Sequence, residues 1–223
     1  MAKKKAKKSG ALGVVAAVLI LVVAILTFSM LATPLYKETK TTNNAITGES
    51  VKETQLTAYE FMDEMNEETT SIDKDGNEVK SSVIKDVKNM VKFAEEKGIS
   101  GDDLKNMKAN IAVYDTILAV EVLAGVALAL GLVALILLAL GKGTAGFVFN
   151  LIAVLAILAI FVCACIMTSN CNVLCDLMKA EASLGSLAAL KIETKTIAPI
   201  IVLVVSLLGS LVTGALAVVG RKK

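Results

Sequence analysis

The chain has 223 residues, of which 55% are hydrophobic and 20% are charged, and its mean hydropathy is +0.70. This composition is too apolar for an ordinary soluble domain, and the formal net charge of +2 hides an uneven distribution of lysines and acidic residues. Six phenylalanines, three tyrosines and no tryptophan, without a basic surface to accompany them, exclude a nucleic-acid-binding protein.

Four apolar segments are each long enough to cross the roughly 30 Å hydrocarbon core of a bilayer. They cover residues 11–33, 113–140, 145–168 and 197–219, and none of them contains a lysine or an arginine. The first segment is longer than the apolar core of a typical secretory signal peptide, so we expect an uncleaved anchor rather than a cleaved leader.

Short basic segments flank these spans on one side of the membrane. They are residues 1–10 with five lysines, the turn 141–144 with Lys142, and residues 220–223 with three basic residues. The positive-inside rule therefore predicts a multi-pass protein of the plasma membrane with both termini in the cytoplasm. The basic N-terminus is expected to act as a topology signal, with a contact to anionic lipid as the alternative. Two extracellular loops remain, residues 34–112 and residues 169–196.

The first extracellular loop is the only region large enough to form a separate domain, and it carries 11 lysines against 16 acidic residues. Its Thr- and Asn-rich stretch 39–44 is typical of an exposed linker, and residues 51–68 fit a helix in part and a strand in part. Asp75 and Gly76 lie between two short alternating arms, which predicts a β-hairpin over 71–79. The acidic residues there lack EF-hand spacing, so we expect a solvated turn and no calcium site.

Two helices are expected in the rest of this loop. Apolar residues recur at helical spacing from Val79 to Ala94, and Gly98 is placed to end that helix. Ser100 and Asp103 resemble a capping box that starts the next helix. Nothing in the sequence interrupts this second helix before residue 140, so the sequence predicts one long helix that continues into the second span.

Glu121 and Asn150 are the candidate polar sites within the spans. An ionisable or polar residue in a span points to an ion path, a proton relay or a contact with a partner. Tyr114, however, is typical of a membrane interface, which places Glu121 near the edge of the hydrocarbon core. We therefore expect a partly hydrated Glu121, with a polar contact to another span or a role in transport as alternatives.

Small residues at four-residue spacing predict faces where helices pack closely. Packing within one bundle is the expected use of these faces, and packing between subunits is the alternative. The predicted helix-packing residues are Gly125 and Gly131 in the second span and Ser206, Gly209, Ser210, Thr213 and Gly214 in the fourth.

The four cysteines lie close together, at positions 163, 165, 171 and 175. Their spacing does not match a zinc site and the chain has no histidine, so no metal is expected. A disulfide between Cys171 and Cys175 is the alternative to free thiols, and it requires that the helix has loosened there. Further on, residues 190–197 alternate like a short strand that we expect to pair with the arms of the hairpin.

Together these elements predict an all-α membrane protein: a four-transmembrane-helix bundle with a small extracellular α+β cap made of a hairpin and short helices. Inside termini, a long first outer loop, a short inner turn and a shorter second outer loop resemble the claudin-type four-span arrangement. The claudin tryptophan and paired-cysteine motifs are missing from residues 34–112, so the resemblance transfers no functional residue. The lysine-rich, tryptophan-free composition is also similar to small uncharacterised four-span membrane proteins of Gram-positive bacteria.

The sequence favours a non-enzymatic, structural or interaction protein whose acidic extracellular cap contacts another membrane or envelope protein, the cell envelope or a second copy of the chain. A transporter, a channel or an accessory subunit of a membrane complex that uses Glu121 is the alternative. An enzyme is not expected, because the sequence has no histidine, no nucleophile motif and no P-loop. The lipid bilayer is the expected surrounding, and no cofactor or small-molecule substrate is evident.

Overall fold

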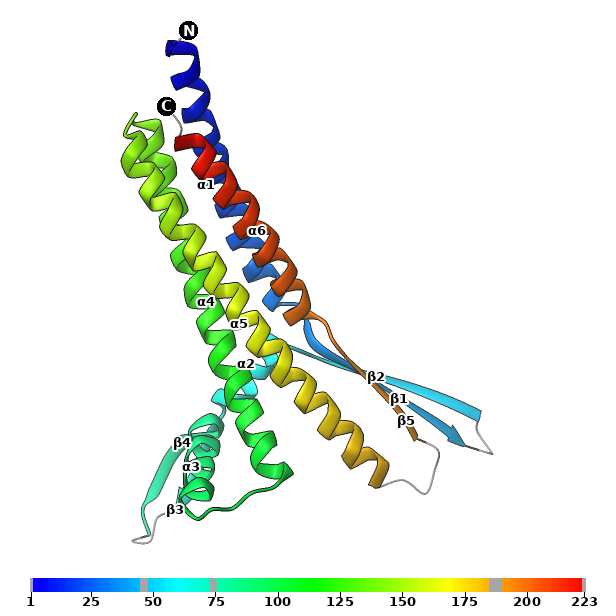
Figure 1. Ribbon diagram of the computed structural model, residues 1–223. Helices are drawn as coiled ribbons and strands as arrows, with labels where there is room; N and C mark the ends of the chain where they lie inside the picture. The colour runs from blue at the N-terminus through cyan, green and yellow to red at the C-terminus, as the bar shows by residue number, and fades with distance from the viewer. Residues whose placement is uncertain (1, 45–47, 73–75, 185–189, 222–223) are drawn as a thin grey trace. The chain divides into compact units, whose positions relative to one another are not determined.

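The computed structural model describes residues 2–44, 48–72, 76–184 and 190–221 (Figure 1). The chain divides into two compact units. The first, here called the helical unit, contains residues 1–30, 118–165 and 200–223. The second, here called the mixed unit, contains residues 31–117 and 166–199. Each unit is described by itself below.

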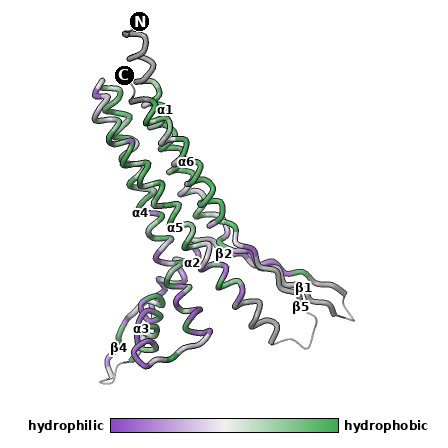
Figure 2. Tube along the Cα trace, in the orientation of Figure 1, coloured by the Kyte–Doolittle hydropathy of each residue, from purple (hydrophilic) through white to green (hydrophobic). Residues whose placement is uncertain are grey.

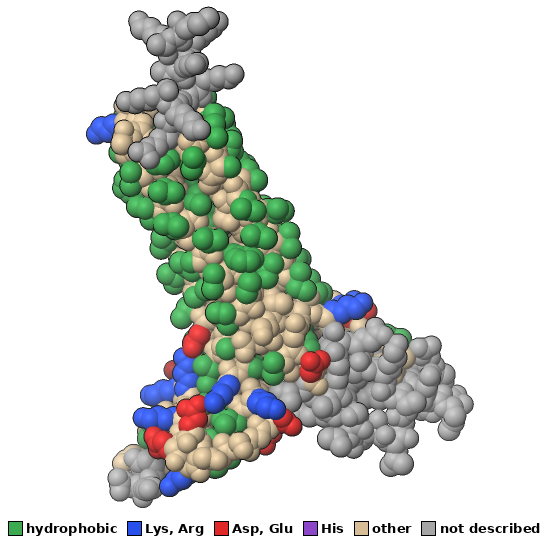
Figure 3. Space-filling model, in the orientation of Figure 1, with side chains coloured by type: hydrophobic (Ala, Val, Ile, Leu, Met, Phe, Trp, Pro, Cys, Tyr) green, Lys and Arg blue, Asp and Glu red, His purple; other side chains and the backbone are tan. Residues whose placement is uncertain are grey.

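Four long helices supply the helical unit: α1 (Ala2–Leu31), α4 (Asp102–Ala139), α5 (Gly143–Leu184) and α6 (Ala198–Arg221). Within them, the candidate membrane spans are Ala11–Leu31, Asp102–Ala139, Gly143–Asp176 and Ala198–Val219, and each contains an apolar segment long enough to cross a membrane. Figure 2 shows the apolar residues running along these helices, and the visible described side chains of the bundle in Figure 3 are mostly hydrophobic. The chain is therefore a multi-pass integral membrane protein with four spans.

The turn between α4 and α5 is a compact helix end. Gly141 has a φ of 75°, in the left-handed region that favours glycine. The amide of Gly141 donates to the carbonyl of Leu138 at 3.1 Å, and the amide of Lys142 donates to the carbonyl of Leu137 at 2.8 Å. These two bonds form the Schellman pattern that closes a helix, so α5 can begin only two residues later, at Gly143.

The core of the helical unit lies where α1 meets its neighbours. Ile20, Val23 and Ala24 of α1 pack with residues of α4 and α5 in one buried cluster, whose other members are Ala127, Ala153, Ala156 and Ile157. Four of these seven side chains are alanines, and small side chains let helix backbones approach closely where the surrounding lipid is as apolar as the helices themselves.

A three-stranded antiparallel sheet forms one part of the mixed unit, with β1 (Pro34–Asn44) between β2 (Gly48–Thr57) and β5 (Leu190–Thr196). The prediction of a linker at 39–44 is wrong, because these threonines and asparagines pair with β2 on one side and, up to Thr42, with β5 on the other. The predicted strand at 190–197 is confirmed as β5, but its expected pairing with the hairpin arms is wrong. Strand β5 pairs with β1 instead, since Tyr36 lies opposite Thr196.

The region 51–68 contains both kinds of structure that the sequence allowed. Strand β2 ends at Thr57, and α2 (Ala58–Asn66) begins at the next residue. The hydroxyl of Thr57 accepts from the amide of Glu60 at 3.2 Å, while a Glu60 carboxylate oxygen accepts from the amide of Thr57 at 2.8 Å. This capping box satisfies two backbone donors that a helix start otherwise leaves free, and it sets the boundary between strand and helix.

The predicted hairpin is confirmed as β3 (Glu68–Ile72) paired with β4 (Glu78–Ser82), and its turn residues 73–75 lie outside the described residues. Helix α3 (Val83–Glu96) follows directly, and Gly98 with a φ of 65° ends it as predicted. The start of that helix was placed too early, because Val79 belongs to β4 rather than to the helix. The long second helix is confirmed as α4, which runs unbroken from Asp102 to Ala139.

Candidate functional site

Helix α3 and the first turns of α4, both in the mixed unit, form an antiparallel pair tied by two ion pairs. The ammonium of Lys88 lies 2.9 Å from a carboxylate oxygen of Asp115, and that of Lys108 lies 2.7 Å from Glu95. A step from residue 88 to residue 95 on α3 is matched by a step back from residue 115 to residue 108 on α4. The partners also exchange signs, because α3 supplies the lysine of one pair and the carboxylate of the other. Both features fix the register of the two helices.

One face of each helix in this pair is buried. The buried residues of α3 are Ile84, Val91 and Ala94. Those in the part of α4 that pairs with it include Ala109, Val113 and Ile117. Their spacing of three, four or seven residues is that of an apolar helical stripe. The ion pairs join more exposed side chains outside these stripes, so burial of the stripes supplies most of the stabilisation and the charges supply orientation.

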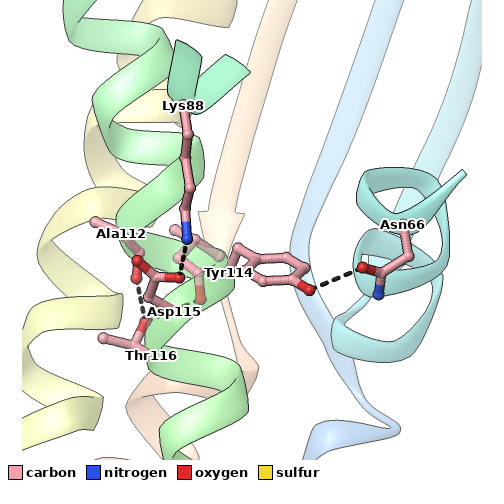
Figure 4. Close-up of polar contacts among 7 residues, drawn as sticks. Asn66, Lys88, Ala112, Tyr114, Asp115 and Thr116 are labelled. Atoms are coloured by element: carbon pink, nitrogen blue, oxygen red, sulfur yellow. Dashed lines mark hydrogen bonds and ion pairs between the residues drawn. The ribbon is translucent and has the colours of Figure 1, made fainter. Parts of the chain in front are cut away.

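Tyr114 connects this helix pair to α2. Its hydroxyl lies 2.8 Å from the side-chain oxygen of Asn66, and the ammonium of Lys88 lies 5.7 Å from the centre of its ring. Figure 4 shows Tyr114 pointing from α4 toward Asn66 while Asp115, the next residue, turns toward Lys88. Two adjacent residues of α4 thus hold α2 and α3. The sequence marked Tyr114 only as a membrane-interface residue and gave no signal for Asn66.

The outward face of α2 carries an acidic stripe. Glu60, Asp63, Glu64 and Glu67 recur at three- and four-residue spacing on the face opposite the buried Ala58, Phe61 and Met65. Glu60 is used by the capping box. The other three carboxylates are exposed, and within the described part of the chain they form no ion pair.

The outward face of α3 combines lysines with apolar side chains. Lys85 and Lys92 are exposed one heptad apart, and neither has an ion-pair partner among the residues that the structure describes. Phe93 is 57% exposed and lies about 80–100° around the helix from these lysines, and Met90, 51% exposed, lies on the far side of Phe93. The ammonium of Lys97 lies 5.9 Å from the centre of the Phe93 ring, so a third lysine borders this face. We call Lys85, Met90, Lys92 and Phe93 the α3 face.

Two groups of the mixed unit have pKa values that report local contacts. The pKa of the Asp86 carboxyl lies below its ordinary value because the hydroxyls of Thr69 and Ser81 donate to it, the first at 2.6 Å. Burial raises the pKa of Tyr36 to about 12, and the negative charge of Glu64 adds to the effect. The first contact fastens α3 to the hairpin. The second places the phenol of β1 near the carboxylate of α2.

Asn150 is a deeply buried polar candidate of the helical unit, with 1% of its surface exposed. Its side-chain nitrogen donates to the carbonyl of Gly13 at 3.0 Å, which links α5 to α1. Its side-chain oxygen has no hydrogen-bond partner among the described residues. Glu121 lies on α4 in the same unit, is half-buried, and forms no ion pair with any described residue. The structure does not bring Glu121 and Asn150 together in any described contact.

The predicted packing residues of α6 and α4 have different surroundings. A Cβ added at Gly209 would meet both methyl groups of Val23 at 2.8 Å, and one at Gly131 would meet Ile20 and Leu21 at 3.0 Å. At Gly214 the nearest atom, in Val154, is 3.5 Å away, whereas Gly125 has nothing within 4 Å. Three hydroxyl residues on α6 donate to carbonyls of their own helix, and these are Ser206, Ser210 and Thr213.

A close contact that the sequence reasoning missed lies at Gly146. A Cβ there would stand 2.5 Å from Cγ of Leu138, so α5 crosses α4 almost at backbone contact just after the turn. Its position three residues after Gly143, at the start of a span, is the only signal for it in the sequence.

Cys171 and Cys175 are buried free thiols, and Cys163 and Cys165 are also free. Helix α5 continues through both positions to Leu184. The loosened helix that the disulfide between Cys171 and Cys175 requires is therefore not found, and the disulfide is not formed in this structure.

Comparisons of the chain with protein-family models, with curated proteins and with solved structures give no match.

Proposed function

We propose that this integral membrane protein is a non-enzymatic interaction protein, and that its mixed unit binds another macromolecule outside the cell through the α3 face. The observation that carries the proposal is the exposure of Phe93 and Met90 on the helix that also presents Lys85 and Lys92, two lysines that have no ion-pair partner among the described residues. Methionine and aromatic residues are enriched at the centres of protein interfaces, with charged residues around them.

The scaffold behind this face supports a binding role. The ion pairs of Lys88 and Glu95 hold α3 in one register on α4, and the bond between Asp86 and Thr69 holds it to β3. These contacts hold α3 in place while Lys85, Lys92 and Phe93 stay exposed, and such preorganisation favours affinity.

The orientation is part of the proposal. We apply the positive-inside rule to the short basic segments. It puts the N-terminal lysines, Lys142 and the basic C-terminal residues in the cytoplasm. The mixed unit is then extracellular. A cysteine introduced at the exposed Lys105 should react with an impermeant maleimide added to intact cells, and one introduced at Lys142 should react only after permeabilisation. The opposite labelling pattern would reverse the orientation.

Photo-crosslinking tests the binding role directly. A photoreactive amino acid replaces Phe93 in the full-length protein, and the native membrane is irradiated before mass spectrometry identifies the adduct. We expect a discrete macromolecular adduct from position 93. The matched control places the same probe at Lys105, which is exposed on α4 of the same unit. Equal labelling from both positions, or no adduct from position 93, would refute a binding role for the α3 face.

A further inference from the structure

We propose that the partner of the α3 face is a second copy of this chain, bound through the acidic stripe of α2. This inference rests on the proposed function and names its partner. The mixed unit carries both halves of a complementary pair: exposed carboxylates at Asp63, Glu64 and Glu67, and exposed lysines at Lys85 and Lys92. None of these five groups has an ion-pair partner among the described residues.

The two patches are close enough to share one interface. Helices α2 and α3 contact each other, and the amide of Val83 at the start of α3 donates to the carbonyl of Glu67 at the end of α2, at 3.1 Å. The carboxylates lie opposite the buried residues of α2, and Lys85 and Lys92 lie one heptad apart on the exposed side of α3. Steering between the acidic stripe and the α3 face therefore requires no rearrangement of either helix.

In a dimer with two-fold symmetry, the contact between the acidic stripe and the α3 face forms twice. In an isologous dimer, residue i of one copy contacts residue j of the other, and j contacts i in return. The acidic stripe of each copy would face the lysines of its partner, with Phe93 and Met90 supplying apolar contact to one side of these charges. Like charges placed against each other would disfavour any arrangement that matches α2 with α2 or α3 with α3.

Charge reversal on differently tagged full-length copies tests this pairing. The first variant carries Lys85→Glu and Lys92→Glu, and the second carries Asp63→Lys and Glu67→Lys. Each variant alone should co-purify with its own kind on the order of tenfold less than the wild type does, because both contacts of the dimer become repulsive. A mixture of the two variants should regain co-purification, since every acidic patch again faces a basic one.

A matched control has the same change of charge elsewhere. Lys52→Glu with Lys105→Glu alters two exposed lysines on β2 and α4 and should leave self-association unchanged. Asp63, Glu67 and Lys92 make no described side-chain contact within the copy that carries them, and Lys85 only adds its positive charge to the contacts that lower the pKa of Asp86, so the variants are expected to fold. Circular dichroism and elution volume check this before the association is compared.

The outcomes separate this inference from the proposed function. If position 93 crosslinks to a different protein, self-association through this face is refuted and the binding role of the α3 face stands. If it crosslinks only to lipid, both proposals are refuted. If the wild type self-associates and the mixed charge-reversal variants fail to restore pairing, the dimer uses another surface and the inference is wrong. If neither crosslink nor self-association is found, both proposals fail.

Discussion

Lys88 on α3 and Asp115 on α4 form a 2.9 Å ion pair across 27 positions of the chain, and the ammonium of Lys88 also lies beside the ring of Tyr114. The side chain of Lys88 is 45% exposed and that of Asp115 is 51% exposed. Water therefore screens the attraction, and the value of the pair lies more in register than in stability.

A double-mutant cycle on this pair should give a coupling of below about 1 kcal/mol. The variants are Lys88→Ala, Asp115→Ala and the double substitution, and hydrogen exchange of the α3 amides measures the opening of the helix. The pair Lys105–Asp102, three residues apart on α4 and more exposed, is the control and should couple by no more than about 0.5 kcal/mol. A coupling of several kcal/mol at Lys88 would show that the pair is shielded from water in the protein.

Packing between α6 and α1 should depend on the absence of a side chain at Gly209. Gly209→Val places carbon atoms against the methyl groups of Val23 and should destabilise the bundle by about 1–3 kcal/mol. Gly125→Val adds the same atoms at a position where nothing lies within 4 Å of an added Cβ, so it should lower the stability of the bundle only slightly. Thermal unfolding in detergent compares the two, and Val23→Ala should partly rescue the Gly209 variant. Equal losses at both glycines would contradict this close approach.

Asn150→Leu should change the stability of the bundle by less than about 1 kcal/mol. The substitution removes the bond to the carbonyl of Gly13, and it also removes a buried oxygen that has no described partner. The two effects oppose each other. Asn150→Asp keeps the shape of the side chain but buries a carboxyl group where the amide was. It should therefore be the more destabilising variant when thermal unfolding in detergent compares the two. If leucine is as harmful as aspartate, the amide oxygen of Asn150 has a partner beyond the described residues.

The mixed unit should lose stability in acid through Asp86. Its folded-state pKa is lowered below 3.8 by the hydroxyls of Thr69 and Ser81, so its contribution is present above pH 3.8 and disappears as the pH falls through the folded-state value. Thr69→Val should raise that pKa toward its ordinary value and weaken the acid dependence. Carboxyl NMR titration measures the shift. Ser71→Ala, which removes another hydroxyl of β3, should leave the Asp86 titration unchanged.

The parts of the fold that follow from local chemistry could be predicted. Hydropathy and length located the four spans, the run without a breaking residue predicted α4 as one helix, and Asp-Gly between alternating arms predicted the hairpin of β3 and β4. Strand β1 was missed because its threonines and asparagines are polar residues that also suit an exposed linker. What identifies it as a strand is pairing with β2 and β5, and β5 is far away in the sequence.

The candidate site was less predictable, because it depends on which faces meet. The apolar spacing of α3 predicted a buried face, yet no local pattern shows that Lys88 meets Asp115 or that Tyr114 meets Asn66. Those contacts arise from the antiparallel register of α3 and α4. The position of Gly146 at the start of a span was too weak a signal to predict its close approach to α4, since a glycine there looks the same in the sequence whether or not another helix touches it.

The order of strands in the sheet also constrains how the protein is made. Tyr36 of β1 lies opposite Thr196 of β5, which leaves the ribosome about 160 residues later. The middle strand, β1, therefore cannot pair with β5 until most of the chain has been synthesised. Until then one edge of β1 has only unpaired backbone groups, which can capture any other extended segment. The sheet can close only after the third span has been inserted and the segment behind it has reached the same side of the membrane as β1. A ribosome stalled before residue 190 would therefore leave an open edge that a chaperone or protease of that compartment can recognise.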